Sequence, residues 1–173
     1  MLDILKIGHP VLRERTKRVK RIDRGIKILA KRMIEAMGEA GGIGLAAPQV
    51  GQSIRLIIVD HSYIEKGAGP KAYVNPEILK AEGEAVMEEG CLCIPGVRGK
   101  VVRSEKITLK CQNLEGEEQV ITCDDLLARV FQHEVDHLKG ILFVDRIQIP
   151  DKQITEGRIP DPSLLRPIPS KAL

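Results

Sequence analysis

The sequence has very few aromatic residues. It contains no Trp, two Tyr and two Phe, so aromatic side chains make up 2% of the 173 residues. Hydrophobic residues nevertheless account for 43% of the chain. The core must therefore be built from aliphatic side chains, and a chain of this length is most simply one domain with a substantial core.

Other features that are absent exclude several classes of protein. No apolar run is long enough to cross a membrane, and the first residues (MLDI) lack the apolar stretch of a secretory signal. Four cysteines without an export signal indicate reduced thiols rather than a disulfide framework. The net charge of +3 is too small to predict a nucleic-acid partner. We therefore expect a soluble intracellular domain with no membrane association and no direct nucleic-acid recognition.

Residues 131–140 contain the pattern His133-Glu134-x-x-His137. At about 3.6 residues per helical turn, positions i and i+4 share a face, so both imidazoles can reach one metal ion. Glu134 falls beside them without being a ligand. A catalytic site of this kind usually has about three protein ligands, so the rest of the chain must supply another.

The helix that carries this pattern is predicted to be buried. Asp124 or Asp125 is a suitable N-cap, and Gly140 stands where a glycine would end the helix. Apolar residues occupy most of the circumference between these ends, which is typical of a helix inside a protein. Ligands on such a helix would be held rigidly.

The remaining pattern predicts an α+β fold. A second helix is indicated from Asp23 to the glycine pair at 41–42, and Pro76 indicates an edge or bulge in one strand. Residues 7–13 are expected to be extended. Strands are predicted over residues 54–60, 74–79, 97–103, 106–112, 118–123 and 141–149. We expect antiparallel sheets packed around one central, metal-binding helix.

The chain is predicted to divide near residue 150. Residues 1–150 carry the periodic patterns and form the catalytic domain. In residues 151–173 four prolines lie close together, which excludes a long helix. This tail is expected to be extended or partly disordered.

Three candidates for the third ligand can be compared. One class of metallopeptidases places a third histidine six residues after the second, but Phe143 stands there. Another class uses a downstream glutamate, and Glu156 lies in the proline-rich tail. Cys91 follows a glycine, and a thiolate is a strong ligand for zinc or ferrous iron. A free cysteine is often just a small buried hydrophobe, but the open coordination position favours Cys91 as a ligand.

Three segments together resemble the peptide deformylase family. They are GIGLAAPQVG at residues 42–51, EGCLC at 89–93 and QHEVDHLKG at 132–140. The likeness includes PVLR at 10–13 and LFVD at 142–145, and it covers roughly residues 4 to 147. Each segment alone is weak or moderate support, because HExxH also occurs by chance. The combination in this order and spacing is highly specific.

The resemblance implies a metal-dependent hydrolase that removes the formyl group from the N-terminal formyl-methionine of newly made polypeptides and releases formate. It implies metal binding by Cys91, His133 and His137. It implies that Glu134 is the catalytic acid–base and that Gln49 and the backbone N–H of Leu92 form the oxyanion site.

The resemblance also predicts how substrate is held. Gly44 would lie along the peptide backbone, and Arg98 matches a position that helps to hold substrate. An apolar slot for the methionine side chain would be lined by residues that could equally be plain core: Ile43, Met87, Leu126 and Val130. Cys93 departs from the family, which usually has serine there; we interpret it as a neighbour of the site, because a second thiolate ligand would close the open position.

The implied cofactor is one divalent metal ion. Fe²⁺ is the expected ion, with Zn²⁺, Ni²⁺ or Co²⁺ as alternatives. The implied partners are N-formyl-methionyl nascent peptides and, transiently, the ribosome, in a cytoplasm of bacterial type. Two other functions remain open from the residues alone: a small HExxH metallopeptidase, or a metal-stabilised binding protein with an inactive site.

Overall fold

The structure is a computed structural model that describes residues 2–147, 153–166 and 168. Within these residues the chain forms two α-helices and eight strands, and the strands belong to two antiparallel sheets. The predicted α+β class with antiparallel pairing is therefore confirmed. None of the helices in the described part of the chain is long and apolar enough to span a membrane.

The larger sheet has five strands in the order β1-β2-β3-β6-β7. Its strands are β1 (Gly44–Ala46), β2 (Leu56–Asp60), β3 (Pro70–Glu82), β6 (Lys106–Gln112) and β7 (Glu118–Asp124). The register of β3 shifts between Val74 and Glu77, on either side of Pro76, so the expected irregularity is confirmed. β1 stands at one edge of this sheet, which leaves one side of its backbone without a neighbouring strand.

The smaller sheet has three strands in the order β4-β5-β8. They are β4 (Ala85–Cys91), β5 (Ile94–Arg103) and β8 (Ile154–Glu156). The sequence predicted only β5 among them. β8 comes from the tail, which was expected to be extended, and it pairs with β5 rather than standing free. The predicted domain boundary at residue 150 lies outside the described residues and stays a prediction.

Helix α1 (Arg24–Glu39) covers the β1–β2 side of the larger sheet. It begins at Asp23, whose side chain accepts a hydrogen bond from Ile26 N at 3.1 Å. Its buried face is aliphatic, as the scarcity of aromatic residues requires, and includes Met33 and Met37.

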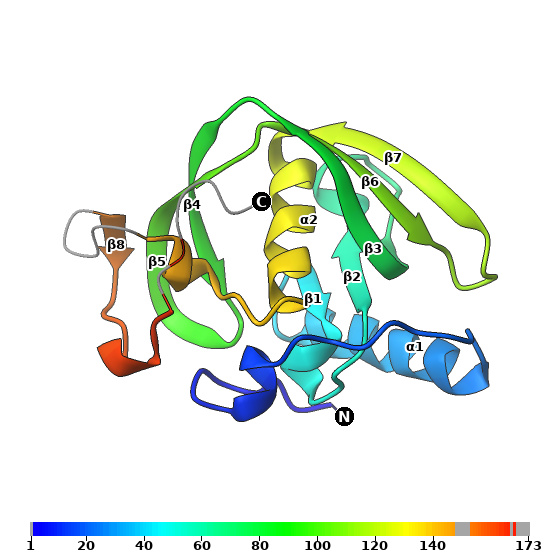
Figure 1. Ribbon diagram of the computed structural model, residues 1–173, viewed down its shortest axis with the longest axis horizontal. Coiled ribbons are helices and arrows are strands. Elements are labelled where there is room, and N and C mark those ends of the chain that lie inside the picture. The colour runs from blue at the N-terminus through cyan, green and yellow to red at the C-terminus, as the bar shows by residue number, and fades with distance from the viewer. Residues whose placement is uncertain (1, 148–152, 167, 169–173) are drawn as a thin grey trace.

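Helix α2 (Asp125–His137) lies between the two sheets (Figure 1). Every residue from 128 to 137 is buried, as the nearly continuous apolar circumference predicts. Phe131 and Val135 belong to the core shared with the larger sheet. His133 and His137 face the smaller sheet, where they contact Glu89 and Cys91 of β4. Glu134 instead packs against Gly44 of β1.

Two predictions of extended structure are wrong. Pro10–Arg13 forms a 3₁₀ helix, because proline at its first position needs no N–H partner and the His9 ring accepts from Val11 N at 3.3 Å. Phe143–Arg146 is also a 3₁₀ helix rather than a strand. There the Asp145 carboxylate accepts from Leu142 N at 2.8 Å and pairs with Arg13, which closes a turn. Residues 148–149 of that predicted strand lie outside the described residues.

Candidate active site

Three potential metal ligands meet where β4 ends beside α2. Cys91 is the last residue of β4, and His133 and His137 lie on one face of α2. One donor atom from each residue lies within 4.8 Å of the others, and Cys91 Sγ is 3.3 Å from His137 Nε2. The fold therefore brings the Cys91 thiol next to two imidazoles that follow it by more than 40 positions in the sequence.

The chemistry of this group fits a divalent metal ion. Thiolate and imidazole are ligands that zinc and ferrous iron share. Burial raises the pKa of the Cys91 thiol to about 12, and the neighbouring Cys93 adds to the effect. The thiol alone would thus stay protonated, whereas a bound cation favours the thiolate.

Cys93 lies next to the group but does not belong to it. Its Sγ is 3.0 Å from Cys91 Sγ, and the residue is fully buried among apolar side chains under β5. The three grouped donors are Cys91, His133 and His137. This arrangement agrees with the interpretation of Cys93 as a neighbour rather than a ligand.

Glu89 orients His133, a role that the sequence did not reveal. Its Oε2 is 2.9 Å from His133 Nδ1, which leaves Nε2 of the ring for a metal ion. The same carboxylate accepts from Arg103 Nε at 2.5 Å and from Arg129 Nη1 at 2.6 Å. The available signal was its position two residues before Cys91, which puts both side chains on the same side of β4.

The buried charges continue beyond Glu89. Asp136 accepts from Arg103 Nη1 at 2.7 Å and from Arg146 Nε at 2.5 Å. Burial alone would raise the pKa of Glu89, but Arg103 and the hydrogen bonds from His133 and Arg103 outweigh it and hold that pKa well below its usual range. The face of α2 that carries His133 is thus held against β4 and β5 by ionised side chains.

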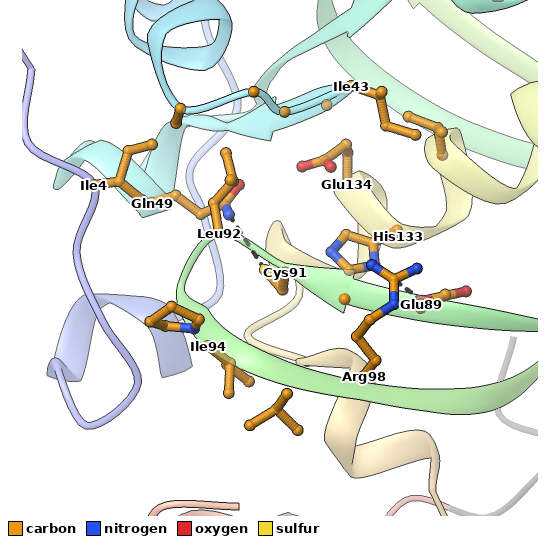
Figure 2. Close-up of a pocket in the computed structure, with 18 of the residues that line it drawn as sticks. Ile4, Ile43, Gln49, Glu89, Cys91, Leu92, Ile94, Arg98, His133 and Glu134 are labelled. Atoms are coloured by element: carbon orange, nitrogen blue, oxygen red, sulfur yellow. Dashed lines mark hydrogen bonds and ion pairs between the residues drawn. The ribbon is translucent and has the colours of Figure 1, made fainter. Parts of the chain in front are cut away.

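Glu134 points into the pocket beside the ligand group (Figure 2). Its Oε2 is buried and has no hydrogen-bond partner among the described residues. Burial raises the pKa of this carboxyl to about 7, although His133 and Arg103 oppose the shift. Gly44 makes room for it, because a Cβ at position 44 would come within 2.4 Å of Glu134 Oε1.

Gln49 approaches the same point from the opposite wall. Its Oε1 accepts from Ala46 N at 2.7 Å, which turns Nε2 toward Cys91 Sγ at 3.5 Å (Figure 2). Leu92 follows Cys91 and also lines the pocket, while its carbonyl accepts from Lys6 Nζ at 2.9 Å. Both predicted oxyanion donors therefore lie close to the ligand group.

The pocket has a volume of about 770 Å³. Its lining includes most of the residues predicted to bind substrate, namely Ile43, Gly44, Arg98, Leu126 and Val130. Met87 does not appear among the described residues of this lining. It stands four residues before Cys91 on β4, which is about 13 Å of strand away from the ligand group. The place of Met87 in the predicted slot therefore stays a prediction.

Comparisons with known proteins agree on one family. A family model described as polypeptide deformylase matches residues 1–153. A peptide deformylase of Halothermothrix orenii is 50% identical over 147 residues, which cover 85% of this chain and 94% of that relative. A peptide deformylase of Dictyoglomus turgidum is 48% identical over 146 residues, covering 84% of this chain and 92% of that relative.

Solved structures give the same result for the fold. The peptide deformylase from Synechococcus elongatus, in complex with actinonin, superposes with a TM-score of 0.87 at 38% identity, covering 96% of this chain and 92% of that one. The peptide deformylase from Thermotoga maritima gives a TM-score of 0.81 at 45% identity, covering 86% of this chain and 99% of that one.

Proposed function

Because this chain belongs to the polypeptide deformylase family and is a metal-dependent hydrolase, we propose that Cys91, His133 and His137 hold its metal ion. Its reaction removes the formyl group from the N-terminal formyl-methionine of newly made polypeptides and releases formate. In this proposal α2 is the metal-binding helix around which both sheets pack. The observation that carries the assignment is the meeting of these three donors with the unpartnered carboxylate of Glu134 in one pocket.

The proposed chemistry needs an activated water and a stabilised oxyanion. A divalent ion, when bound, lowers the pKa of water and polarises a carbonyl oxygen. Glu134 accepts the proton of the attacking water and later delivers it to the leaving amine. A carboxyl with a pKa of about 7 can both accept and release a proton near neutral pH. A metal ion bound nearby would lower this pKa and favour the charged carboxylate.

Gln49 and the backbone N–H of Leu92 are proposed to stabilise the developing oxyanion. The bond from Ala46 N to Gln49 Oε1 fixes the amide so that its N–H₂ faces the ligand group. A donor fixed in advance costs no reorganisation during reaction, and the loss of one such donor typically lowers the rate by about 100-fold or more.

The substrate peptide is proposed to lie along β1. Because β1 is an edge strand, its outward-facing backbone at Gly44 can pair with an extended peptide. Arg98 lies at the pocket rim, where it can hold the peptide further along. The methionine side chain would enter a slot formed by Ile43, Met87, Leu126 and Val130, of which Ile43, Leu126 and Val130 line the pocket.

We propose Fe²⁺ as the resident ion, with Zn²⁺, Ni²⁺ and Co²⁺ as alternatives, because a Cys/His/His set accepts each of them and availability decides. Anaerobic purification, elemental analysis and activity with each ion would identify it. Transient association with the ribosome in a bacterial-type cytoplasm is proposed to supply nascent chains. Co-sedimentation with translating ribosomes would test that part.

The direct test is formate release from formyl-Met-Ala, compared with cleavage of unblocked Met-Ala. Metal-dependent formate release with no cleavage of the unblocked peptide supports a deformylase. Cleavage of the unblocked peptide would instead indicate a metallopeptidase. Binding of metal with neither activity would indicate an inactive site that serves only stability.

The slot can be tested with the first side chain alone. Formyl-norleucine peptides should be nearly as good as formyl-methionine peptides, since such swaps usually cost under about 1.5 kcal/mol. Formyl-alanine should be clearly worse, because each lost methylene forgoes about 0.8 kcal/mol of burial. Formyl-aspartate should be worse still, since a carboxylate would enter without a partner. A flat profile of kcat/KM across the series would contradict the slot.

A further inference from the structure

A short series of contacts joins the tail strand to the pocket. Glu88 on β4 accepts from Arg98 Nε on β5 at 2.6 Å. The other oxygen of the same carboxylate accepts from the Thr155 hydroxyl on β8 at 2.5 Å. Each oxygen of Glu88 is therefore held by a different strand. The three side chains span all three strands of the smaller sheet.

The backbone holds β8 firmly at this position. Glu156 pairs with Arg98, and Ile154 pairs with Gly99. Just beyond the strand, Gly157 has φ +72°, and a Cβ there would come within 2.0 Å of Gly96 O. Only glycine fits such a conformation and approach. The tail thus packs directly against the beginning of β5, at Gly96 and Val97, which line the pocket.

Arg98 extends from β5 over the residue that precedes Cys91. Its Nη1 lies 3.4 Å from the place where a Cβ of residue 90 would stand, so Gly90 provides the space for the guanidinium. Figure 2 shows the side chain on the wall of the pocket beside the ligand group. Nε donates to Glu88, whereas neither Nη makes a hydrogen bond within the described residues. Both terminal nitrogens therefore remain available to a peptide carbonyl.

We infer that Thr155 is a positioning residue: by fixing Glu88 it holds the Arg98 guanidinium over Gly90, where the free nitrogens bind a backbone carbonyl beyond formyl-methionine. This inference rests on the proposed function, and it makes β8 part of the substrate site. Without the hydroxyl, Glu88 has only Arg98 to restrain it, and both long side chains regain rotational freedom that binding must then remove. The expected consequence is weaker binding of longer peptides with unchanged chemistry.

The test is Thr155→Val, which removes the hydroxyl while keeping the side-chain shape and all charges. kcat and KM are measured with the amides of formyl-Met-Ala and formyl-Met-Ala-Ser, so that the two peptides differ in length but not in terminal charge. KM for the longer peptide should rise about threefold, the scale of one net hydrogen bond. kcat for both peptides and KM for the shorter one should stay unchanged.

Three matched variants complete the experiment. Thr155→Ser keeps the hydroxyl and should behave as wild type. Thr122→Val removes an equally exposed hydroxyl, which contacts Thr108 on the larger sheet, and should also behave as wild type. Arg98→Ala should raise KM for the longer peptide, and adding Thr155→Val to it should have no further effect. Equal melting temperatures would exclude a general loss of stability.

Several outcomes would overturn the inference. A wild-type KM for the longer peptide in Thr155→Val, together with a raised KM in Arg98→Ala, would show that Thr155 does not position Arg98. Additive effects in the double variant would show that the two residues act independently. An unchanged KM in Arg98→Ala would show that Arg98 does not contact the substrate. Absence of formate release from the wild-type enzyme would instead contradict the proposed function.

Discussion

Glu88 and Glu89 are neighbours on β4, and each pairs with an arginine of β5, yet they belong to different environments. The Glu88–Arg98 pair lies at the pocket rim, with side chains 42% and 47% exposed. The Glu89–Arg103 pair lies inside, with side chains 5% and 1% exposed. Strand alternation alone separates them. The comparison teaches that one type of ion pair can stand in water at the pocket rim on one face of a strand and be buried against His133 on the other.

The largest expected effect is that of Glu89→Ala. This change leaves Arg103 and Arg129 buried with one partner fewer and releases the ring of His133. Loss of one partner from a buried pair costs about 3–5 kcal/mol, so the free energy of unfolding in urea should fall by that amount. Glu88→Ala is the matched control and should unfold like wild type, because its pair is exposed to water. Equal losses of unfolding free energy in the two variants would contradict the difference between the buried pair and the exposed pair.

A second contrast on the same chain segment concerns Cys91 and Cys93. Cys91→Ser replaces the proposed thiolate ligand with a hydroxyl, which is a poor ligand. Changing a residue that only hydrogen-bonds to a ligand typically lowers metal affinity about 10- to 100-fold, and the loss in Cys91→Ser should be larger. Cys93→Ser should retain metal and activity and should survive peroxide better. Metal content after dialysis against a chelator measures both. Equal metal loss from the two variants would show that the coordination assignment is wrong.

Acid should reduce the contribution of the buried Glu89 to the stability of the fold. The pKa of Glu89 is lower in the folded protein than its ordinary value of 4.5, because Arg103 and hydrogen bonds from His133 and Arg103 outweigh the opposing effect of burial. A carboxyl with a depressed pKa stabilises the fold above its unfolded pKa and loses that contribution as pH falls toward the folded pKa. The stability advantage of wild type over Glu89→Gln should therefore be full at pH 7 and shrink below about pH 4.5. A constant difference across this range would contradict the assignment.

The smallest effect is expected at the exposed pair. Glu88→Gln should raise KM for the amide of formyl-Met-Ala-Ser slightly at about 0.01 M salt, where screening acts over about 30 Å. The difference from wild type should vanish at about 1 M salt, where that length is about 3 Å. The unfolding deficit of Glu89→Ala should persist at both concentrations. A salt-independent KM effect would mean that Glu88 acts through packing instead of charge.

The sequence predicted the α+β class and α2 well, because a helix that is apolar around most of its circumference has few alternatives to burial. The grouping of Cys91 with two histidines was also within reach, since two ligands on one helix face require another. It did not predict the role of Glu89, because the partners Arg103 and Arg129 are distant in sequence and meet this carboxylate only when β4, β5 and α2 pack together. It missed the 3₁₀ helices at Pro10–Arg13 and Phe143–Arg146, where the Arg13–Asp145 contact decides the local conformation.

The most direct test of the account is the rate of formate release per bound metal ion in Glu134→Gln. The substitution keeps the size of the side chain and removes its proton acceptor, while Cys91, His133 and His137 stay unchanged. The account predicts wild-type metal content and nearly complete loss of turnover. Normal turnover in the fully metal-loaded variant would contradict the role assigned to Glu134 and, with it, the proposed mechanism.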